Sequence, residues 1–261
     1  MEEENRCPDT QQPNDFRAAR RAFSRIGFAF CALLILWNAV NAAFSYAVSG
    51  LWPDAAGEMW VRLFVNAVAL YGCAIPVFFL LVRRMPAALP ADCRMRGGDF
   101  WIALLMCYAL MIGGNLAGML VTGLFQLATG LETGNAAYDI LTSGESFAAL
   151  FVTVGLLAPL FEELLCRKLI LDRLYPYGRK TALIVSALAF GALHGNLSQF
   201  FYAAALGLLF GYIYMRTGKL RYSVLLHMII NTFSLVLSTL MSDFLTMGEP
   251  SAELFLTMSL P

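Results

Sequence analysis

The sequence predicts an all-α, polytopic membrane protein with about seven transmembrane helices. Two observations predict this fold class. Hydrophobic residues make up 59% of the 261 residues and charged residues only 14%, whereas about a quarter of the residues in a soluble domain are charged. Apolar runs of the roughly 20 residues that a helix needs to cross the hydrocarbon core also recur along the chain.

Seven apolar runs define the predicted spans, and the fifth and sixth of them are short. They cover residues 26–48, 60–82, 100–129, 146–172, 181–195, 199–215 and 222–242. The first run is longer than the apolar core of roughly 7–15 residues in a cleaved signal peptide, so we expect it to be retained as a span. The turn-rich segments 49–59 and 130–145 are predicted to be external loops.

Basic residues alternate between the two sides of this predicted bundle. Arginine and lysine concentrate in cytoplasmic loops, and here they gather in the N-terminal tail and in segments 83–96, 167–180 and 216–221, with Arg62 as the exception. This pattern predicts a cytoplasmic N-terminus and an external C-terminus. The net charge is zero and no basic stripe is present, so we expect no nucleic-acid partner.

A small set of polar side chains lies inside the predicted spans. An ionisable residue costs about 2.5–3.5 kcal/mol at the middle of a membrane helix, so each is a functional candidate by default. The candidates are Glu162, Glu163 and Arg167 in the fourth span, His194 in the fifth, and His227 and Asn231 in the seventh. At a rise of about 1.5 Å per residue, Glu162, His194 and Asn231 lie about 15–21 Å above the basic ends of their helices. His227 lies at about 9 Å, so we expect all of these side chains to converge near the middle of the membrane.

Spacing within the fourth helix separates its two glutamates. Glu163 and Arg167 stand four residues apart with the acid first, which is the favourable order for an ion pair. We expect this pair to hold the helix in place. Glu162 is rotated by about 100° from Glu163, so we expect it to face a different cavity, where it could act as a general base.

The seventh helix carries two hydrogen-bond donors on one face. His227 and Asn231 stand four residues apart, and an imidazole N–H and an amide NH₂ could stabilise an oxyanion that forms on a peptide carbonyl. His194 is expected to lie across the cavity and to orient the attacking water. Hydrolysis would then need no covalent intermediate.

Other chemistries were weighed for the same residues. A single His or Asn in a membrane bundle is often only an interhelical hydrogen-bonding group. No cofactor is the expectation, but two histidines and a glutamate also form a common zinc ligand set, which would be Glu162, His194 and His227. The chain contains no HExxH and no GxSxG motif. Tyr138 and Asp139 lie in a predicted external loop without the Gly-x-Gly-Asp partner of an aspartyl intramembrane protease.

Three motifs resemble those of the CPBP family of intramembrane endopeptidases, the CAAX protease and bacteriocin-processing or Abi proteins. Glu162, Glu163 and Arg167 match Glu-Glu-x-x-x-Arg, Phe190 and His194 match Phe-x-x-x-His, and His227 and Asn231 match His-x-x-x-Asn. The resemblance covers about residues 150–235. It implies a helical fold, often of eight spans, around an intramembrane catalytic cavity. In that cavity Glu162 and His194 activate water, while the last His and Asn stabilise the oxyanion.

The resemblance implies an intramembrane endopeptidase, a class long labelled metalloprotease, that acts on a membrane-associated protein or peptide. A membrane immunity or scaffold protein of the same family is the alternative, and a transporter is less favoured because no internal repeat is visible. The chain then divides into a tail at 1–25, N-terminal helices at 26–145, a CPBP-like core at 146–242 and a second tail at 243–261. Besides the substrate, the bilayer is the expected partner, and the short loops favour a prokaryotic plasma membrane.

Overall fold

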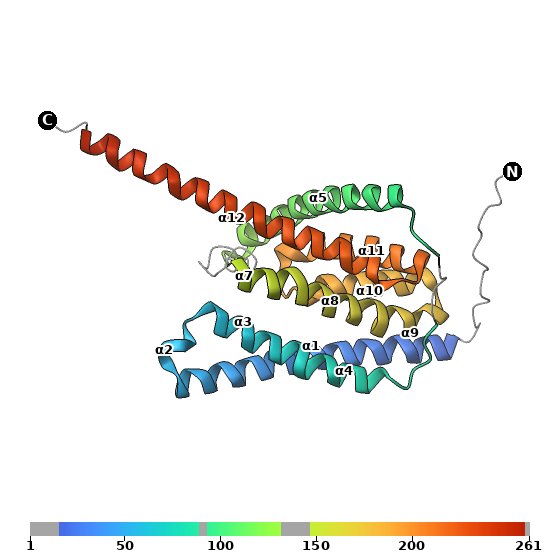
Figure 1. Cartoon of the computed structure of the whole chain (residues 1–261). Helices are drawn as coiled ribbons and strands as arrows, with labels where there is room; N and C mark the ends of the chain where they lie inside the picture. Colours follow the sequence, from blue (N-terminus) through green and yellow to red (C-terminus); the bar gives the residue numbers. More distant parts are fainter. Residues whose placement is uncertain (1–15, 89–92, 132–146, 259–261) are drawn as a thin grey trace.

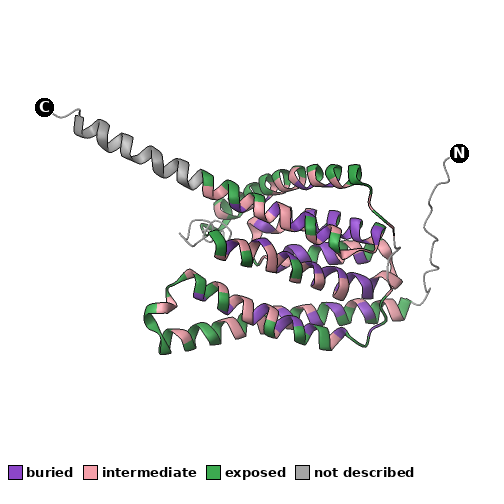
Figure 2. Ribbon diagram, in the orientation of Figure 1, coloured by how far each residue is buried: buried purple, intermediate pink, exposed green. Residues whose placement is uncertain are grey.

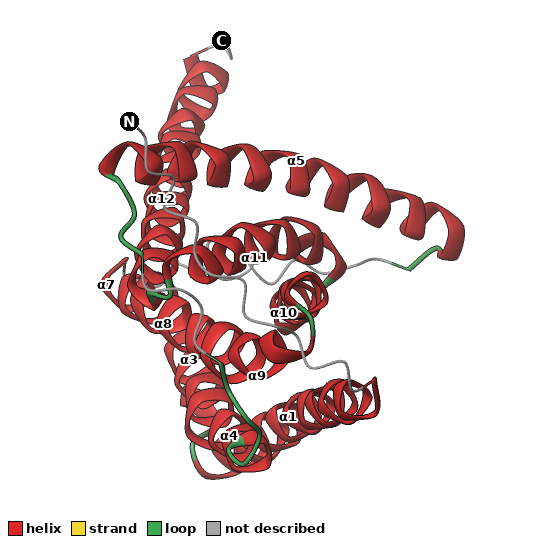
Figure 3. Cartoon of the chain, turned by 90° about the vertical axis from the view of Figure 1, so that its right-hand side faces the viewer, coloured by secondary structure: helices red, strands yellow, loops and turns green. Residues whose placement is uncertain are grey.

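The computed structural model describes residues 16–88, 93–131 and 147–258, with side chains as far as residue 240. Within these ranges every regular element is a helix (Figure 1; Figure 3). Six helical rods of the described chain are long and apolar enough to cross a membrane, so the predicted polytopic all-α membrane fold is confirmed. They are Phe16–Leu51, Met59–Val82, Gly97–Thr129, Phe147–Tyr177, Leu197–Thr217 and Leu220–Leu240.

The first two spans form a helical hairpin. α1 covers Phe16–Leu51 and the short α2 covers Pro53–Ala56, and then α3 (Met59–Ala67), η1 (Val68–Ala74) and α4 (Ile75–Val82) follow as one rod. α2 begins with a proline, whose missing N–H is no loss in the first turn of a helix. The indole Nε1 of Trp37 in α1 donates to Asn66 Oδ1 in α3 at 2.9 Å, so a polar bond joins the two arms.

The fourth span is not a straight α-helix. It consists of α7 (Phe147–Leu150), η2 (Phe151–Leu157), α8 (Ala158–Glu163), η3 (Leu164–Leu171), α9 (Asp172–Leu174) and η4 (Tyr175–Tyr177), of which η2 and η3 are π-helical. The π-helical η1 and η2 each end two residues before a proline, Pro76 and Pro159. Proline lacks an N–H and its ring crowds the preceding turn, which shifts the hydrogen-bond ladder. The uniform rise of about 1.5 Å per residue used to estimate depth therefore does not hold throughout this span.

The fifth predicted span, 181–195, corresponds to α10 (Arg179–Leu193), which has 15 residues. At about 1.5 Å per residue it is roughly 22 Å long, short of the roughly 30 Å hydrocarbon core. The helix ends where Gly195 adopts a φ of +68°, and α11 (Leu197–Thr217) begins at once with Asn196, whose side chain accepts from the Gln199 N–H. Thus α10 and α11 form a tight hairpin inside the bundle, and six rather than seven described helices are long enough to span.

The outermost helices extend beyond the predicted spans. α1 begins at Phe16, inside the predicted N-terminal tail, and α12 (Leu220–Met258) continues through most of the predicted C-terminal tail (Figure 1). Hydropathy marks where an apolar run stops, but helix formation can continue in polar sequence. Residues 132–146, which include Tyr138 and Asp139, lie outside the described ranges.

Helix α5 (Gly97–Thr129) packs closely on α11 because its glycines leave room for the neighbouring backbone. A Cβ on Gly114 would lie 2.3 Å from the Tyr202 Cα, and a Cβ on Gly118 would lie 2.3 Å from the Ser198 carbonyl oxygen. The spacing of four residues places both glycines on one helix face, as in the small-xxx-small contacts of membrane helices.

The helices form two layers that are joined at one end. The hairpin of α1 and α3–α4 is one layer, and the fourth span with α10, α11 and α12 forms the other, with α5 packed on the outer side of α11 (Figure 1). One buried cluster lies between the two layers and a second lies between α5, α11 and α12 (Figure 2). The buried residues of α1 all lie in its first half, at Ala22, Ile26, Ala29 and Leu33, and they belong to one core cluster with Ile170 of η3. Between Leu33 and Leu51, α1 has no buried residue.

Polar bonds reinforce the joined end. Arg173 Nε donates to the Val82 carbonyl at the end of α4 at 2.9 Å. Nearby, the Tyr214 hydroxyl donates to Asp172 Oδ1 at 2.8 Å and accepts a hydrogen bond from Lys168 Nζ. Asp172, Arg173 and Tyr214 are all buried, so the fourth span is tied to both of its neighbours at this level.

Candidate active site

A buried ion pair lies at the centre of the bundle. Arg167 Nε donates to Glu163 Oε2 at 2.9 Å and Arg167 Nη2 donates to Oε1 at 3.2 Å, so the pair is bidentate. Both side chains have no exposed surface. The ion pair expected from the spacing of four residues is therefore present, and a guanidinium fork matched to a carboxylate has the geometry that a buried charge requires.

Ser186 of α10 is a further member of this network. Arg167 Nη1 donates to Ser186 Oγ at 2.9 Å, and that hydroxyl donates to the Cys166 carbonyl at 2.8 Å. The face of the guanidinium lies 5.4 Å from the centroid of the Phe190 ring. Sequence reasoning missed Ser186, although it stands four residues before Phe190 on the same face of α10.

His227 lies between the two glutamates. Its Nε2 is 3.9 Å from Glu162 Oε2 and its Nδ1 is 3.6 Å from Glu163 Oε1. The two carboxylates share one neighbour, because the imidazole of His227 on α12 lies near both of them. A rotation of about 100° between neighbouring residues separates two short side chains, but a glutamate has enough length to turn back toward a common partner.

Two polar atoms at this point are buried without a hydrogen-bond partner among the described residues. They are Glu162 Oε2 and His227 Nδ1. Buried polar atoms in native proteins are nearly always paired, so an unpaired carboxylate oxygen beside an imidazole calls for a bound group. The Glu162 side chain retains 17% exposure, in contrast to the fully buried Glu163, so only the first glutamate remains accessible.

Both histidines border Phe190. The centroid of the Phe190 ring lies 5.4 Å from that of His194 and 5.3 Å from that of His227, in edge-on contacts. The Phe210 ring stacks on the other side of His227 at 5.4 Å. His194 Nδ1 lies 3.0 Å from the Phe190 carbonyl oxygen, which leaves Nε2 as the nitrogen that can face a reacting group.

Asn231 lies one helical turn beyond His227 and reaches the fourth span. Its Nδ2 donates to the Val154 carbonyl at 3.0 Å. Val154 belongs to the π-helical η2, where the altered ladder can leave a carbonyl available to another helix. An amide nitrogen carries two protons, so this bond orients Asn231 and leaves its second N–H free to donate.

The structure thus places Glu162 and Glu163 each within 4 Å of His227, while the His194 ring contacts the Phe190 ring that also borders His227. In the described part of the chain, no three His, Cys, Asp or Glu side chains are placed to hold a metal ion. Glu162, His194 and His227, the alternative zinc set, do not form such a group among these described residues.

Comparisons with known proteins agree with this location. Residues 144–233 match the family model described as type II CAAX prenyl endopeptidase Rce1-like. A Bacillus subtilis protein, YdiL, whose name describes it as a candidate membrane peptidase, is 21% identical over 209 residues, which cover 76% of this chain and 81% of the relative. No solved structure matches the chain. The resemblance inferred from the three motifs is confirmed: residues 144–233, which hold all three, match the Rce1-like family model, and they lie within an integral membrane protein.

Proposed function

We propose that the protein is an intramembrane endopeptidase, similar to the CAAX proteases, that hydrolyses peptide bonds of a membrane-associated protein or peptide. The observation that carries this proposal is the unpaired, buried Glu162 Oε2 at 3.9 Å from His227 Nε2, at the meeting point of three helices. A group used only to hold helices together would be expected to have its hydrogen bonds made. A group that must receive a proton from water has a reason to leave one oxygen free.

In the proposed reaction Glu162, together with His194, takes a proton from water as the water oxygen attacks the peptide carbonyl. Two donors, His227 and the free N–H of Asn231, stabilise the negative charge that develops on the carbonyl oxygen. Collapse of this intermediate breaks the C–N bond, and Glu162 returns the proton to the leaving amine. Every proton is accounted for without a covalent enzyme intermediate.

The buried pair of Glu163 and Arg167 has a positioning role in this proposal. Both Glu163 oxygens accept hydrogen bonds from the Arg167 guanidinium. The Glu163 carboxylate is therefore held in place, with its Oε1 3.6 Å from His227 Nδ1. That contact orients the His227 ring toward Glu162.

The proposal can be tested with purified protein in nanodiscs and a library of fluorogenic membrane peptides. Glu162→Gln should lower the rate of cleavage roughly 10²–10⁴-fold, the usual contribution of a positioned general base. Glu58→Gln, the same change at an exposed position outside the site, is the matched control and should leave the rate unchanged. His194→Ala tests the second member of the water-activating pair.

A chelator arm tests the zinc alternative. Cleavage that survives a strong chelator supports the glutamate mechanism, whereas cleavage lost to the chelator and restored by zinc would assign a metalloprotease. If the wild-type protein cleaves nothing in the library while Glu162→Gln still supports its role in cells, an immunity or scaffold function of the same family takes the place of peptidase. Equal cleavage by the wild-type protein and Glu162→Gln would refute the role of Glu162.

We also propose a prokaryotic plasma membrane with the N-terminus in the cytoplasm. The support is the distribution of Arg and Lys at one end of the described helices. Labelling of single cysteines introduced near Arg84 and near Gly130 with an impermeant reagent tests the orientation. The reagent should reach the second position in intact cells and the first only after lysis.

A further inference from the structure

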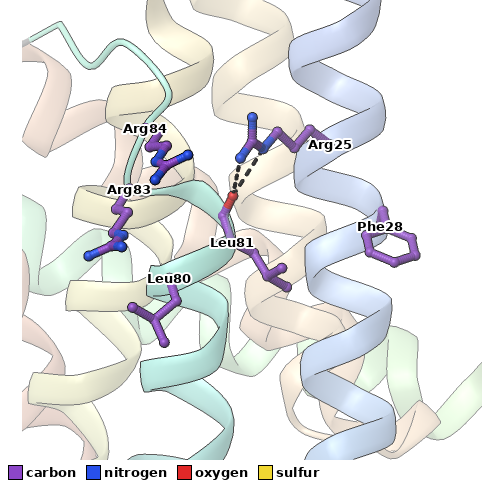
Figure 4. A pocket seen from close by; sticks show the side chains of 6 residues that line it. All are labelled: Arg25, Phe28, Leu80, Leu81, Arg83 and Arg84. Carbon is purple, nitrogen blue, oxygen red and sulfur yellow. Dashed lines mark hydrogen bonds between the residues drawn. The ribbon is translucent and has the colours of Figure 1, made fainter.

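A second polar site lies away from Glu162, at the joined end of the two layers. A pocket of about 300 Å³ opens between the start of α1 and the end of α4. Figure 4 shows the side chains that line it, which are Arg25, Phe28, Leu80, Leu81, Arg83 and Arg84. Three of the six carry a guanidinium and the other three are apolar.

Arg25 is fixed in place rather than extended into solvent. Its Nε and Nη2 both donate to the Leu81 carbonyl, at 2.9 and 2.7 Å (Figure 4). This carbonyl belongs to the last turn of α4, where backbone acceptors lack a donor from their own helix. An arginine that only anchors α1 at the membrane surface would be expected to point its guanidinium toward water. Here the guanidinium turns to the neighbouring helix and forms one wall of the pocket.

The positive charge of this pocket has no described counterion. No side-chain hydrogen bond or ion pair joins Arg83 or Arg84 to another described residue, and the Arg25 guanidinium bonds only to a neutral carbonyl. Three guanidinium groups around one cavity repel one another, and an anion in the pocket would relieve that repulsion. Guanidinium forks match the oxygens of a phosphate, which can accept from more than one arginine at once.

The apolar side chains of the pocket indicate that the bound anion also has a hydrocarbon part. Phe28 is 70% exposed and Leu80 is 54% exposed, on helices that are long and apolar enough to cross a membrane. A ligand that offers a phosphate to the arginines and hydrocarbon to these two side chains would bury both parts. Basic pockets between membrane helices, at the level of the headgroups, bind anionic lipids for the same reason.

We propose that this pocket binds the phosphate headgroup of an anionic phospholipid, whose acyl chains lie along Phe28 and Leu80. The bound headgroup bridges the start of α1 and the end of α4 at the level where the two layers are joined. This inference concerns a site separate from Glu162 and does not depend on peptidase activity.

Native mass spectrometry of the full chain, released from detergent with defined lipids, tests the proposal. Phosphatidylglycerol should be retained in preference to phosphatidylcholine. The double variant Arg83→Gln with Arg84→Gln should weaken phosphatidylglycerol binding by roughly 30-fold, from about 1 kcal/mol for each arginine near a lipid surface. Arg25 is left unchanged, so the bond to Leu81 still joins the helices and folding is preserved.

The matched control is Arg94→Gln with Arg96→Gln, which removes the same charge from exposed positions just before α5. It should change phosphatidylglycerol binding by less than about threefold, because neither side chain lines the pocket and exposed charges are screened by salt. Equal losses of phosphatidylglycerol binding in both double variants would show that the lipid is attracted by the overall positive charge, and would overturn the proposal of a specific site in this pocket. Retention of phosphatidylcholine as strong as that of phosphatidylglycerol would also overturn it. If water-soluble glycerol phosphate competed as well as the intact lipid, the pocket would be a free-anion site and the lipid assignment would be wrong.

Discussion

Removal of the Ser186 hydroxyl should destabilise the protein far more than removal of an equally buried hydroxyl elsewhere. Ser186 and Ser223 are both fully buried. The Ser186 hydroxyl accepts from Arg167 Nη1 at 2.9 Å and donates to the Cys166 carbonyl at 2.8 Å, so it links α10 to the fourth span. The Ser223 hydroxyl donates at 3.1 Å to Leu220, inside its own helix. The two serines therefore form a matched pair for Ser→Ala substitution.

The expected magnitude follows from the groups that lose a partner. A hydrogen bond to a charged group contributes about 1.5–3 kcal/mol, whereas interhelical bonds in membrane proteins average about 0.6 kcal/mol and reach about 1.7. Ser186→Ala leaves one guanidinium N–H unpaired at a position without access to water, so we expect a loss of about 2 kcal/mol in the free energy of unfolding. Ser223→Ala should cost less than about 0.5 kcal/mol, since alanine is the better helix former.

Unfolding in mixed micelles of increasing sodium dodecyl sulfate fraction, followed by circular dichroism, measures both losses. The reasoning requires the transition of Ser186→Ala to move to a lower fraction than that of the wild type, with Ser223→Ala close to the wild type. Coincident transitions for the two variants would refute it, because the bond from Arg167 would then contribute no more than a bond within one helix. A larger loss for Ser223→Ala would do the same.

Two other substitutions test packing and the polar cluster. Gly114→Ala should destabilise the protein by about 1–3 kcal/mol through overpacking, since its Cβ would lie 2.3 Å from the Tyr202 Cα, whereas Gly113 has open space and Gly113→Ala should be neutral or stabilising. Unfolding in the same micelles compares these two variants, and equal transitions would show that the α5–α11 contact is looser than described. Tyr214→Phe removes the donor to Asp172 Oδ1 at 2.8 Å and should cost about 1–3 kcal/mol. Restored stability in the double variant with Asp172→Asn would confirm that loss of this donor to the carboxylate is the cause, and no loss in the single variant would contradict it.

The parts of the site that could be predicted are those set by local spacing. A separation of four residues places Glu163 beside Arg167 in any α-helix, and the pair is present. Depth along the helices also predicted that the fourth span and α12 would bring polar groups together, as Glu162 and His227 show. These predictions depend only on helical rise and rotation.

The parts that could not be predicted depend on contacts between helices and on departures from the α-helix. Nothing in the spacing of the fourth span indicates that His227 would reach both carboxylates, because that depends on how α12 is rotated against α8. The carbonyl that accepts from Asn231 lies in a π-helical stretch. Predictions from the α-helical period of 3.6 residues per turn assume that such stretches are absent. The predicted fifth span, 181–195, has the same length as α10, which has 15 residues but lies two residues earlier because Gly195 ends the helix by its backbone conformation.

The contacts between the two layers are concentrated at one end of the bundle, so that end is stiffer than the opposite end. Every buried residue of α1 lies from Ala22 to Leu33, and the bond from Arg173 to Val82 lies at the same end. Two helical layers joined at one end resist sliding past each other, but they can separate at the opposite end, because separation there exposes little buried surface. The Tyr71–Phe161 stack, with ring centroids 4.5 Å apart, joins the layers next to Glu162. Outward bending of the hairpin would therefore pull first on Phe161, the residue beside Glu162, the proposed general base, so this end of the hairpin is where a segment in the bilayer could approach the site.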